Sequence, residues 1–168
     1  EEYNTLLVTH PYNLGNGAAI KSGARTASGD VLIMMDADGQ HPVDIIDDLI
    51  KEYHNQYDMV VAARRRNSQA NIGRYLANSI YNWLASKIVG HQVKDLTSGF
   101  RLVERNKFLK FLYMLPNGFS YPTTITMAFF KSGYTVSYIP FEAPPREGSS
   151  HIRPINDGIR FLLIIFRV

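Results

Sequence analysis

A run of five apolar residues that ends in two carboxylates constrains this chain more than any other stretch. Residues 31–35 read Val-Leu-Ile-Met-Met, and Asp36 and Asp38 follow directly. A short apolar run without polar alternation is typical of a strand buried on both faces, as in the middle of a parallel sheet. Side chains two residues apart in an extended chain point the same way. We therefore expect the two carboxylates to share one target at the carboxyl end of a strand, where open α/β sheets bind ligands.

Two carboxylates held close together repel each other unless a cation or protons offset their charge. A hard divalent cation prefers oxygen ligands, and Gln40 offers a neutral amide oxygen two residues after Asp38. The pattern therefore indicates a metal site formed by Asp36, Asp38 and Gln40.

Other interpretations of this stretch stay open on the sequence alone. The strand can simply end in an acidic, solvated turn. A phosphotransferase of the haloacid dehalogenase type also places Asp-x-Asp after an apolar strand, although Gln40 then stands where a small hydroxyl or Val is usual. A calcium loop of the helix-loop-helix type fits poorly, because its sixth position is His41 and not Gly, and its twelfth is Asp47 and not Glu.

The composition narrows the class of protein. The chain has 168 residues, enough for one domain with a proper core. A formal charge of +3 is too small to indicate nucleic-acid binding, and the absence of Cys excludes disulfides and Cys metal sites. No apolar run approaches the roughly 20 residues that cross a bilayer. An apolar segment lies close to each end of the sequence, so we expect a fragment of a longer polypeptide.

Apolar periodicity predicts alternating strands and helices. We expect strands over residues 5–9, 31–35, 58–63 and 135–140, a short strand at the end of 94–103, and helices over 18–27, 43–56, 73–89, 106–115 and 120–131. In the helix 73–89, Leu76, Ile80 and Trp83 follow the helical period, and we expect Trp83 in the core.

Two further segments each allow a functional and a plain structural interpretation. The Gly-containing loop 10–17 enters a helix, which suits a phosphate or a simple strand-to-helix turn. The three arginines Arg64 to Arg66 follow a strand, which suits an anion site or a solvated basic loop.

Taken together, four motifs resemble the family 2 glycosyltransferases, and within them the polyprenyl-phosphate sugar transferases typified by dolichyl-phosphate mannose synthase. They are Asn16-Gly17, Gly29-Asp30 before an apolar strand, Asp-Ala-Asp-Gly-Gln-His-Pro at 36–42, and Asp95-x-Thr-Ser-Gly-Phe-Arg101. The resemblance implies an α/β protein of the GT-A fold, a Rossmann-like mixed, mostly parallel sheet with helices on both faces. Motifs of the family's first strands are not seen in this sequence, so we expect residues 1–150 to form a partial GT-A domain.

The resemblance also implies an activity. It is the metal-dependent, inverting transfer of a hexosyl or amino-sugar group from a UDP- or GDP-linked nucleotide sugar to a polyprenyl phosphate, dolichyl or undecaprenyl. The cofactor implied is Mg²⁺ or Mn²⁺, held by Asp36, Asp38 and Gln40. A fragment without the first strands is expected to be inactive alone, and a non-catalytic binding module with the same fold is the alternative.

The resemblance assigns the site residues to three roles. The catalytic group is Asp38, Arg64, Arg74 and Asp95; the donor-binding group is Asn16, Gly17, Asp36, Arg146 and Ser149; and the acceptor phosphate meets Arg64, Arg74 and Asn78. Two positions depart from the family pattern, since Asn78 stands where Ser is common and His151 where Lys is common.

Residues 151–168 predict a juxtamembrane amphipathic helix. Apolar residues recur every three or four positions from Ile155 to Phe166, with Arg153, Arg160 and Arg167 among them. An apolar face with basic flanks suits a helix lying in a membrane interface, and the alternative is a helix packed on the domain. We expect a membrane-associated protein on the cytoplasmic face, with no nucleic-acid partner; a homo-oligomer is left open.

Overall fold

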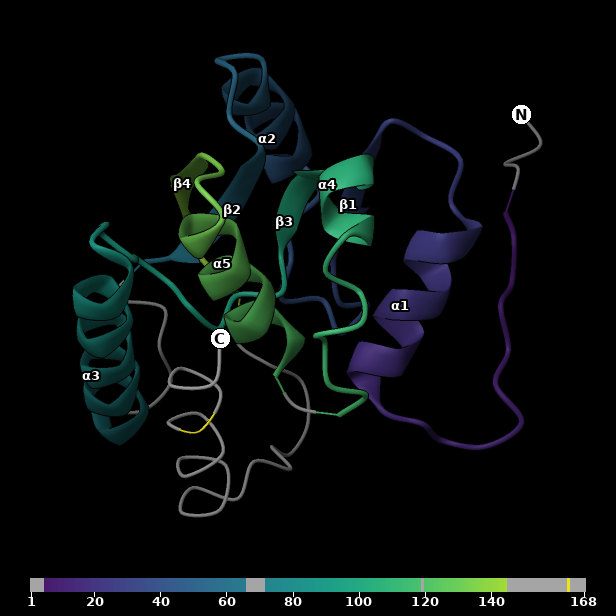
Figure 1. Cartoon of the computed structure of the whole chain (residues 1–168), viewed down its shortest axis with the longest axis horizontal. Coiled ribbons are helices and arrows are strands. Elements are labelled where there is room, and N and C mark those ends of the chain that lie inside the picture. The colour runs from purple at the N-terminus through teal and green to yellow at the C-terminus, as the bar shows by residue number, and fades with distance from the viewer. Residues whose placement is uncertain (1–4, 66–71, 119, 145–162, 164–168) are drawn as a thin grey trace.

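The computed structural model describes residues 5–65, 72–118, 120–144 and 163, with the side chains of 72–75 left out (Figure 1). In chain order the elements are α1 (Asn16–Thr26), β1 (Val31–Met34), α2 (Ile45–Tyr53), β2 (Met59–Arg64), α3 (Ile72–Val89), β3 (Arg101–Glu104), α4 (Arg105–Leu109), α5 (Tyr121–Lys131) and β4 (Val136–Phe141).

The four described strands form one mixed sheet in the order β1-β3-β2-β4. β3 runs antiparallel to both neighbours, with Val31 opposite Glu104 and Val60 opposite Leu102. β4 lies parallel to β2. The mixed sheet is confirmed, but the expectation of a mostly parallel one needs correction. β1, β2 and β4 share one direction, yet β3 runs between β1 and β2, so β2–β4 is the single parallel pair among the described strands.

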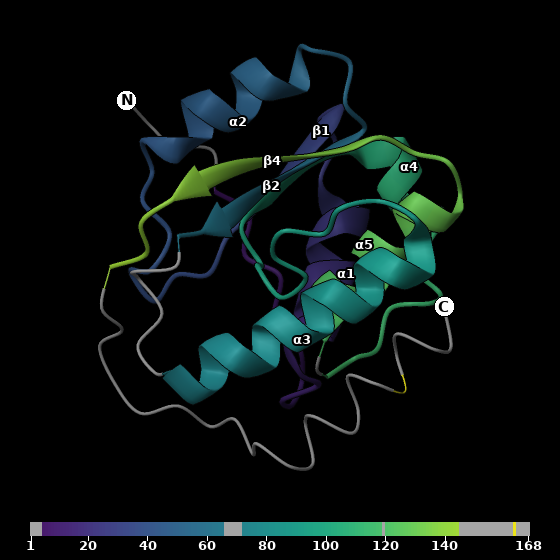
Figure 2. The same cartoon turned by 90° about the vertical axis from the view of Figure 1, so that its left-hand side faces the viewer.

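Helices cover both faces of the sheet, as predicted, because β2 alternates its side chains between two cores. Met59 and Val61 pack in a cluster with residues of α1, α4 and α5. Val60 and Ala62 pack in a second cluster with Leu49 of α2. Figure 2 shows α2 on one side of the sheet and α1 and α5 on the other. All four of these β2 side chains are fully buried. Burial of Met59, Val60 and Val61 stabilises the fold by roughly 1.5–3 kcal/mol for each side chain.

The edge position of β1 overturns the expectation that this strand is buried on both faces. Leu32 and Met34 are buried in the core, but Ile33 and the following Met35 are exposed. The reason is that α2 packs mainly over β2, β3 and β4, so the second face of β1 is covered only at Val31, which packs against the cluster that contains Leu49.

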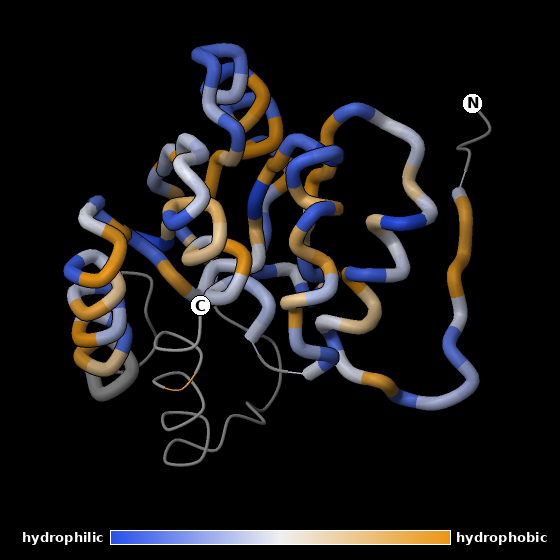
Figure 3. Tube along the Cα trace, in the orientation of Figure 1, coloured by the Kyte–Doolittle hydropathy of each residue, from blue (hydrophilic) through white to orange (hydrophobic). Residues whose placement is uncertain are grey.

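The predicted strand over residues 5–9 is wrong. No strand forms there, and Leu6, Leu7 and Val8 are exposed. This extended apolar segment runs beside α1, away from the sheet (Figures 1 and 3), so its backbone has no described strand to pair with.

The expectation that Trp83 lies in the core is also wrong. α3 packs on α5 through Ala85, in a cluster that includes Met127. Leu76, Ile80 and Trp83 lie on a different side of the helix and are between 55% and 61% exposed. The helical period of these residues is real, but it marks a surface stripe, because α5 meets the neighbouring face.

Two predicted helices differ from expectation in other ways. α4 ends at Leu109, and Phe111 to Leu115 continue in turns with hydrogen bonds to the residue three positions earlier. The C-terminal helix 151–168 lies outside the described residues except for Leu163, which is helical and exposed. Within the described part of the chain, no helix has both the length and the apolar character needed to span a bilayer.

Gly17 lets α1 approach the loop that precedes α5. A Cβ at Gly17 would lie 2.0 Å from the Pro116 carbonyl oxygen. The Ala18 N–H donates to the Asn117 carbonyl at 2.9 Å, and Lys21 donates to the Leu115 carbonyl at 3.1 Å and to the Asn117 side chain. The start of α1 is therefore fastened to residues 115–117 by close backbone contact.

We predict that Gly17→Ala destabilises the fold by about 1–3 kcal/mol, the usual cost of overpacking, because the obstructing atom belongs to the backbone. Gly23→Ala is the matched control in the same helix, since its Cβ would meet nothing within 4 Å. It should stabilise by about 0.5–1 kcal/mol through helix propensity. Urea unfolding of both variants checks the pair, and equal free energies of unfolding would contradict the close approach.

Candidate functional site

The turn after β1 carries the carboxylates and is closed by two hydrogen bonds. The Asp36 N–H donates to His41 Nδ1 at 2.8 Å, and the Gln40 N–H donates to Asp38 Oδ1 at 3.2 Å. Gly39 has φ +77°, a conformation that favours glycine. The sequence thus forms a compact turn that presents Asp36 and Gln40 at the end of the strand.

The His41 ring contacts two aromatic side chains. The ring stacks on Phe100 with a centroid distance of 4.8 Å and an interplanar angle of 18°, and it forms a T-shaped contact with Phe141 at 6.3 Å. Burial, together with the Arg64 charge, outweighs the carboxylates of Asp36 and Asp38 and lowers the pKa of His41. A neutral imidazole can accept a hydrogen bond at Nδ1, as this turn requires.

Arg64, the last residue of β2, forms a forked ion pair with Asp95. Arg64 Nε donates to Asp95 Oδ2 and Nη2 to Oδ1, both at 2.9 Å. The Arg64 backbone N–H adds a bond of 3.2 Å to Oδ2, and Nη2 also meets the Thr97 hydroxyl. The N–H groups of Thr97 and Ser98 each donate to Asp95 Oδ1 at 3.1 Å. Bidentate pairs of this kind fix geometry as well as charge.

The ion pair sets the charge state of both partners. Burial by itself would raise the pKa of Asp95, but the Arg64 guanidinium and the backbone N–H donors hold it below its usual range. Burial opposes the charge on Arg64 as well, and Asp95 outweighs that effect and raises the pKa of Arg64. Asp95 is therefore a buried carboxylate fully engaged in holding Arg64 and the loop 95–98.

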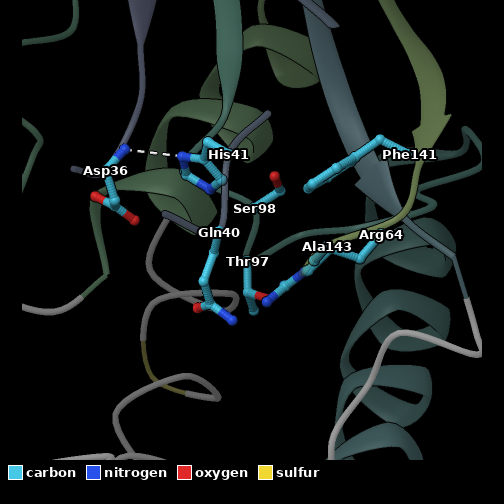
Figure 4. A pocket seen from close by; sticks show the side chains of 9 residues that line it. Asp36, Gln40, His41, Arg64, Thr97, Ser98, Phe141 and Ala143 are labelled. Carbon is cyan, nitrogen blue, oxygen red and sulfur yellow. Dashed lines mark hydrogen bonds between the residues drawn. The ribbon is translucent and has the colours of Figure 1, made fainter. Parts of the chain in front are cut away.

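The turn and the arginine meet at a cavity of about 70 Å³. Figure 4 shows Asp36, Gln40 and Arg64 reaching it from different sides. The Ser98 hydroxyl is buried, and no hydrogen-bond partner reaches it among the described residues. The lining consists of Asp36, Gln40, His41, Arg64, Thr97, Ser98, Gly99, Phe141 and Ala143.

A larger cavity of about 270 Å³ adjoins the first and shares Asp36, Thr97 and Gly99 with it. The Tyr121 hydroxyl donates to the Gly99 carbonyl at 3.1 Å, and burial raises the pKa of Tyr121 to about 12, so the phenol stays protonated. The remaining lining residues are Asn16, Gly118, Ser120 and Pro122. The Asp36 carboxylate thus stands on the wall between two cavities.

Arg101 ties the wall of both cavities to α5. Its side chain is fully buried, which lowers its pKa. It donates to the Ser98 carbonyl, to the Pro122 carbonyl at 3.3 Å and to the Thr126 hydroxyl at 3.1 Å. These bonds offset part of the cost of burying the charge, although Arg101 Nε has no hydrogen-bond partner among the described residues. They also hold the loop 98–99 against the start of α5.

The structure brings part of the predicted site together. Asp36, Gln40 and Arg64 line the smaller cavity, and Asn16 joins Asp36 at the larger one. Asp38 and Asn78 line neither cavity. Gly17 is packed on the Pro116 backbone, and Asp95 is buried beneath Arg64. The side chains of Arg74, Arg146 and Ser149 lie outside the described part of the chain.

Several lining residues were not predicted as site residues. His41, Ser98 and Tyr121 reach the cavities through contacts between distant segments, which a single sequence does not reveal. Asp95 with Thr97 and Ser98 did carry a usable signal, because an Asp whose side chain accepts from N–H groups two and three residues later forms a common turn.

The donor set suits a hard cation only in part. Asp36 and Gln40 bring a carboxylate and an amide oxygen to one cavity, and Asp38 lies in the same turn. Among the described residues, no group of three or more His, Cys, Asp or Glu side chains is placed to hold a metal. Mg²⁺ and related ions commonly take one or two protein carboxylates and fill the other positions with substrate phosphates and water, and this arrangement fits that pattern.

Comparison with known proteins identifies the family. Residues 1–112 match the model of Glycosyl transferase family 2, and the chain belongs to that family. The chain is 35% identical over 94 residues to the undecaprenyl-phosphate 4-deoxy-4-formamido-L-arabinose transferase of Photorhabdus laumondii, covering 56% of this chain and 29% of the relative. It is 29% identical over 123 residues to the dolichyl-phosphate beta-glucosyltransferase ALG5A of Trichomonas vaginalis, covering 68% and 38%. The chain thus spans less than two fifths of either relative.

A solved structure confirms the fold. Glucosyl-3-phosphoglycerate synthase from Mycobacterium tuberculosis, in complex with Mn²⁺, UDP-glucose and phosphoglyceric acid, superposes with a TM-score of 0.69. The match covers 96% of this chain and 56% of that chain, at 15% sequence identity. The shared fold is GT-A.

We predict that Asp95→Asn lowers the free energy of unfolding by about 2 kcal/mol at pH 7, because it removes a charged acceptor from a partly exposed Arg64. The pKa of Asp95 is lower in the folded state, so its contribution is present above about pH 4 and is lost as the pH falls further. Urea unfolding between pH 3 and pH 7 should show the two proteins converging at the acid end.

Asp48→Asn serves as the control, since Asp48 forms an exposed ion pair with Lys51. It should change the free energy of unfolding by less than about 1 kcal/mol. A constant difference between wild type and Asp95→Asn at every pH would contradict the assigned ionisation.

Proposed function

We propose that this chain is the nucleotide-sugar-binding part of an enzyme that transfers a hexosyl or amino-sugar group to a polyprenyl phosphate. The observation that carries the proposal is the convergence of Asp36, Gln40 and Arg64 on one cavity. A carboxylate and an amide oxygen on one side suit a divalent cation, and a guanidinium on the other suits phosphate. A diphosphate chelated to a metal offers both partners at once.

The relatives support the lipid acceptor. Their names specify transfer to undecaprenyl phosphate and dolichyl phosphate. The sugars in these names are a formamido-arabinosyl group and a glucosyl group. We therefore propose a hexosyl or amino-sugar group as the transferred sugar, without restricting it to mannose. The solved relative binds a UDP-sugar with Mn²⁺, which supports a UDP-linked donor; GDP is the other nucleotide to test.

The proposed reaction is a single displacement. An oxygen of the acceptor phosphate forms a bond to C1 of the sugar, and the bond from C1 to the nucleotide's β-phosphate oxygen breaks, with inversion at C1. A phosphate is already ionised, so no strong general base is required. Mg²⁺ or Mn²⁺, held by Asp36, Asp38 and Gln40 with the donor diphosphate, would supply Lewis-acid stabilisation of the leaving group.

The chain's own residues then divide the remaining work. Arg64 meets phosphate charge, and Asp95 positions Arg64 instead of touching the reactants. The larger cavity, with Asn16, Ser120 and the ring of Tyr121, suits the sugar because it combines polar side chains with an aromatic surface. Arg74, Asn78, Arg146 and Ser149 keep their proposed roles at the acceptor and donor phosphates.

We predict that Asp36→Asn weakens the Mn²⁺-dependent binding of UDP or GDP by about tenfold or more, because the substitution removes a charged ligand at the cavity. Asp47→Asn, at an exposed acid in the first turn of α2, should bind like wild type. Calorimetry on the full-length protein measures both. Equal affinities would contradict the metal role, and trapping a phosphoryl group on Asp36 by mass spectrometry would instead favour phosphotransferase chemistry.

Membrane association forms part of the proposal, because a polyprenyl phosphate resides in a bilayer. α3 follows Arg64 in the chain and presents the surface stripe of Leu76, Ile80 and Trp83. Trp is favoured at membrane interfaces. Lys87 is exposed in the last turn of α3, where it can meet anionic headgroups. We therefore place the membrane-facing side at α3, in addition to the predicted helix 151–168, on the cytoplasmic leaflet.

We predict that the double substitution Ile80→Gln with Trp83→Gln reduces flotation with anionic liposomes roughly tenfold, because two apolar side chains no longer enter the interface. The fold should persist, since both residues are exposed. Tyr113→Gln, at an exposed aromatic outside α3, is the matched control and should float like wild type. Unchanged flotation of the double variant would exclude α3 as a membrane contact, and a chain ending at Arg153 tests the C-terminal helix separately.

A further inference from the structure

His41 connects three segments that are far apart in the sequence. Its Nδ1 accepts from the Asp36 backbone, its ring stacks on Phe100 just before β3, and it forms a T-shaped contact with Phe141 at the end of β4. Phe100 and Phe141 also contact each other, at 5.8 Å and 89°. One side chain therefore links the carboxylate turn to the strands that carry the opposite wall of the cavity.

The hydrogen bond defines what each ring nitrogen can do. A backbone N–H can only donate, so the lone pair of Nδ1 is directed at Asp36 and the proton of the neutral ring is on Nε2. Neither nitrogen then presents a free lone pair, which a metal ligand needs. His41 lies beside the predicted metal ligands (Figure 4) without the chemistry to join them in this arrangement.

We propose that His41 is a positioning residue for the metal turn, residues 36–40. Its Nδ1 fixes the backbone at Asp36, and its stacked ring fastens the turn to Phe100. The Nδ1 bond keeps the Asp36 carboxylate on the wall between the two cavities, whereas the stacked ring contributes mainly to the stability of the fold. The effect on metal binding rests on the proposed function, whereas the effect on the turn itself does not.

The two contacts of His41 can be separated by substitution. In His41→Asn, Oδ1 takes the place of Nδ1 as an acceptor, while the ring is lost. In His41→Phe, the ring can still stack on Phe100, while the acceptor is lost. A role limited to packing predicts that Asn is the more harmful substitution. A positioning role predicts the reverse for every property that depends on Asp36.

The first measurement needs no ligand. Hydrogen–deuterium exchange of the Asp36 amide in the full-length protein, resolved to the single residue, reports the turn directly. We expect exchange about tenfold faster in His41→Phe, because the amide loses its acceptor, and within about threefold of wild type in His41→Asn. The melting temperature should follow the opposite order, with His41→Asn the lower of the two.

The second measurement is the affinity for Mn²⁺ in the presence of UDP, by titration of free Mn²⁺ in electron paramagnetic resonance. We expect His41→Phe to bind about tenfold more weakly, as variants of outer-shell partners do, and His41→Asn to stay within about threefold of wild type. Unchanged Asp36 exchange in His41→Phe would overturn the proposal, as would His41→Asn affecting exchange as much as His41→Phe. If wild type itself binds no Mn²⁺ with UDP or GDP, the proposed function fails, and the exchange data still decide the role of His41.

Discussion

The forked ion pair between Arg64 and Asp95 is the interaction on which the site depends. It joins the end of β2 to the loop 95–98, and that loop carries Thr97 and Ser98 into the cavity walls. Replacing a buried pair by apolar residues is often neutral for stability, whereas removing one partner is costly. The buried Asp95 carboxylate is stabilised by the backbone N–H groups of Thr97 and Ser98 as well as by Arg64. The ion pair therefore matters more for positioning Arg64 and the loop 95–98 than for the net stability of the fold.

Most elements could be predicted from the sequence, because apolar runs and helical periods are local properties. α1, α2, β2, α3, α5 and β4 begin or end within a few residues of expectation. The errors concern which surface is covered. The apolar residues 5–9, the second face of β1 and the stripe on α3 all carry core-like patterns but lie exposed. A pattern shows that a surface can be buried, and neighbouring elements decide whether it is.

The same division applies to the candidate site. Asp36, Gln40 and Arg64 could be predicted because each follows or ends a strand, and strands of one direction bring their carboxyl ends to one edge of the sheet. The places of His41 and Tyr121 could not, since they depend on contacts with Phe100 and with the Gly99 carbonyl, which are distant in the sequence. Gly17 was assigned to the donor, and the structure shows a packing reason for glycine there.

The charges of the smaller cavity limit what it can bind. Arg64 is largely balanced by Asp95, whereas Asp36 has no forked partner among the described residues and borders both cavities. A bare diphosphate would gain little from the balanced arginine and would be repelled by the Asp36 and Asp38 carboxylates. When the diphosphate carries a divalent cation, the cation attracts the Asp36 and Asp38 carboxylates, and the contact between phosphate and Arg64 is kept. The arrangement therefore favours a metal–nucleotide complex over either component alone, and the position of Asp36 decides how strongly the two are coupled.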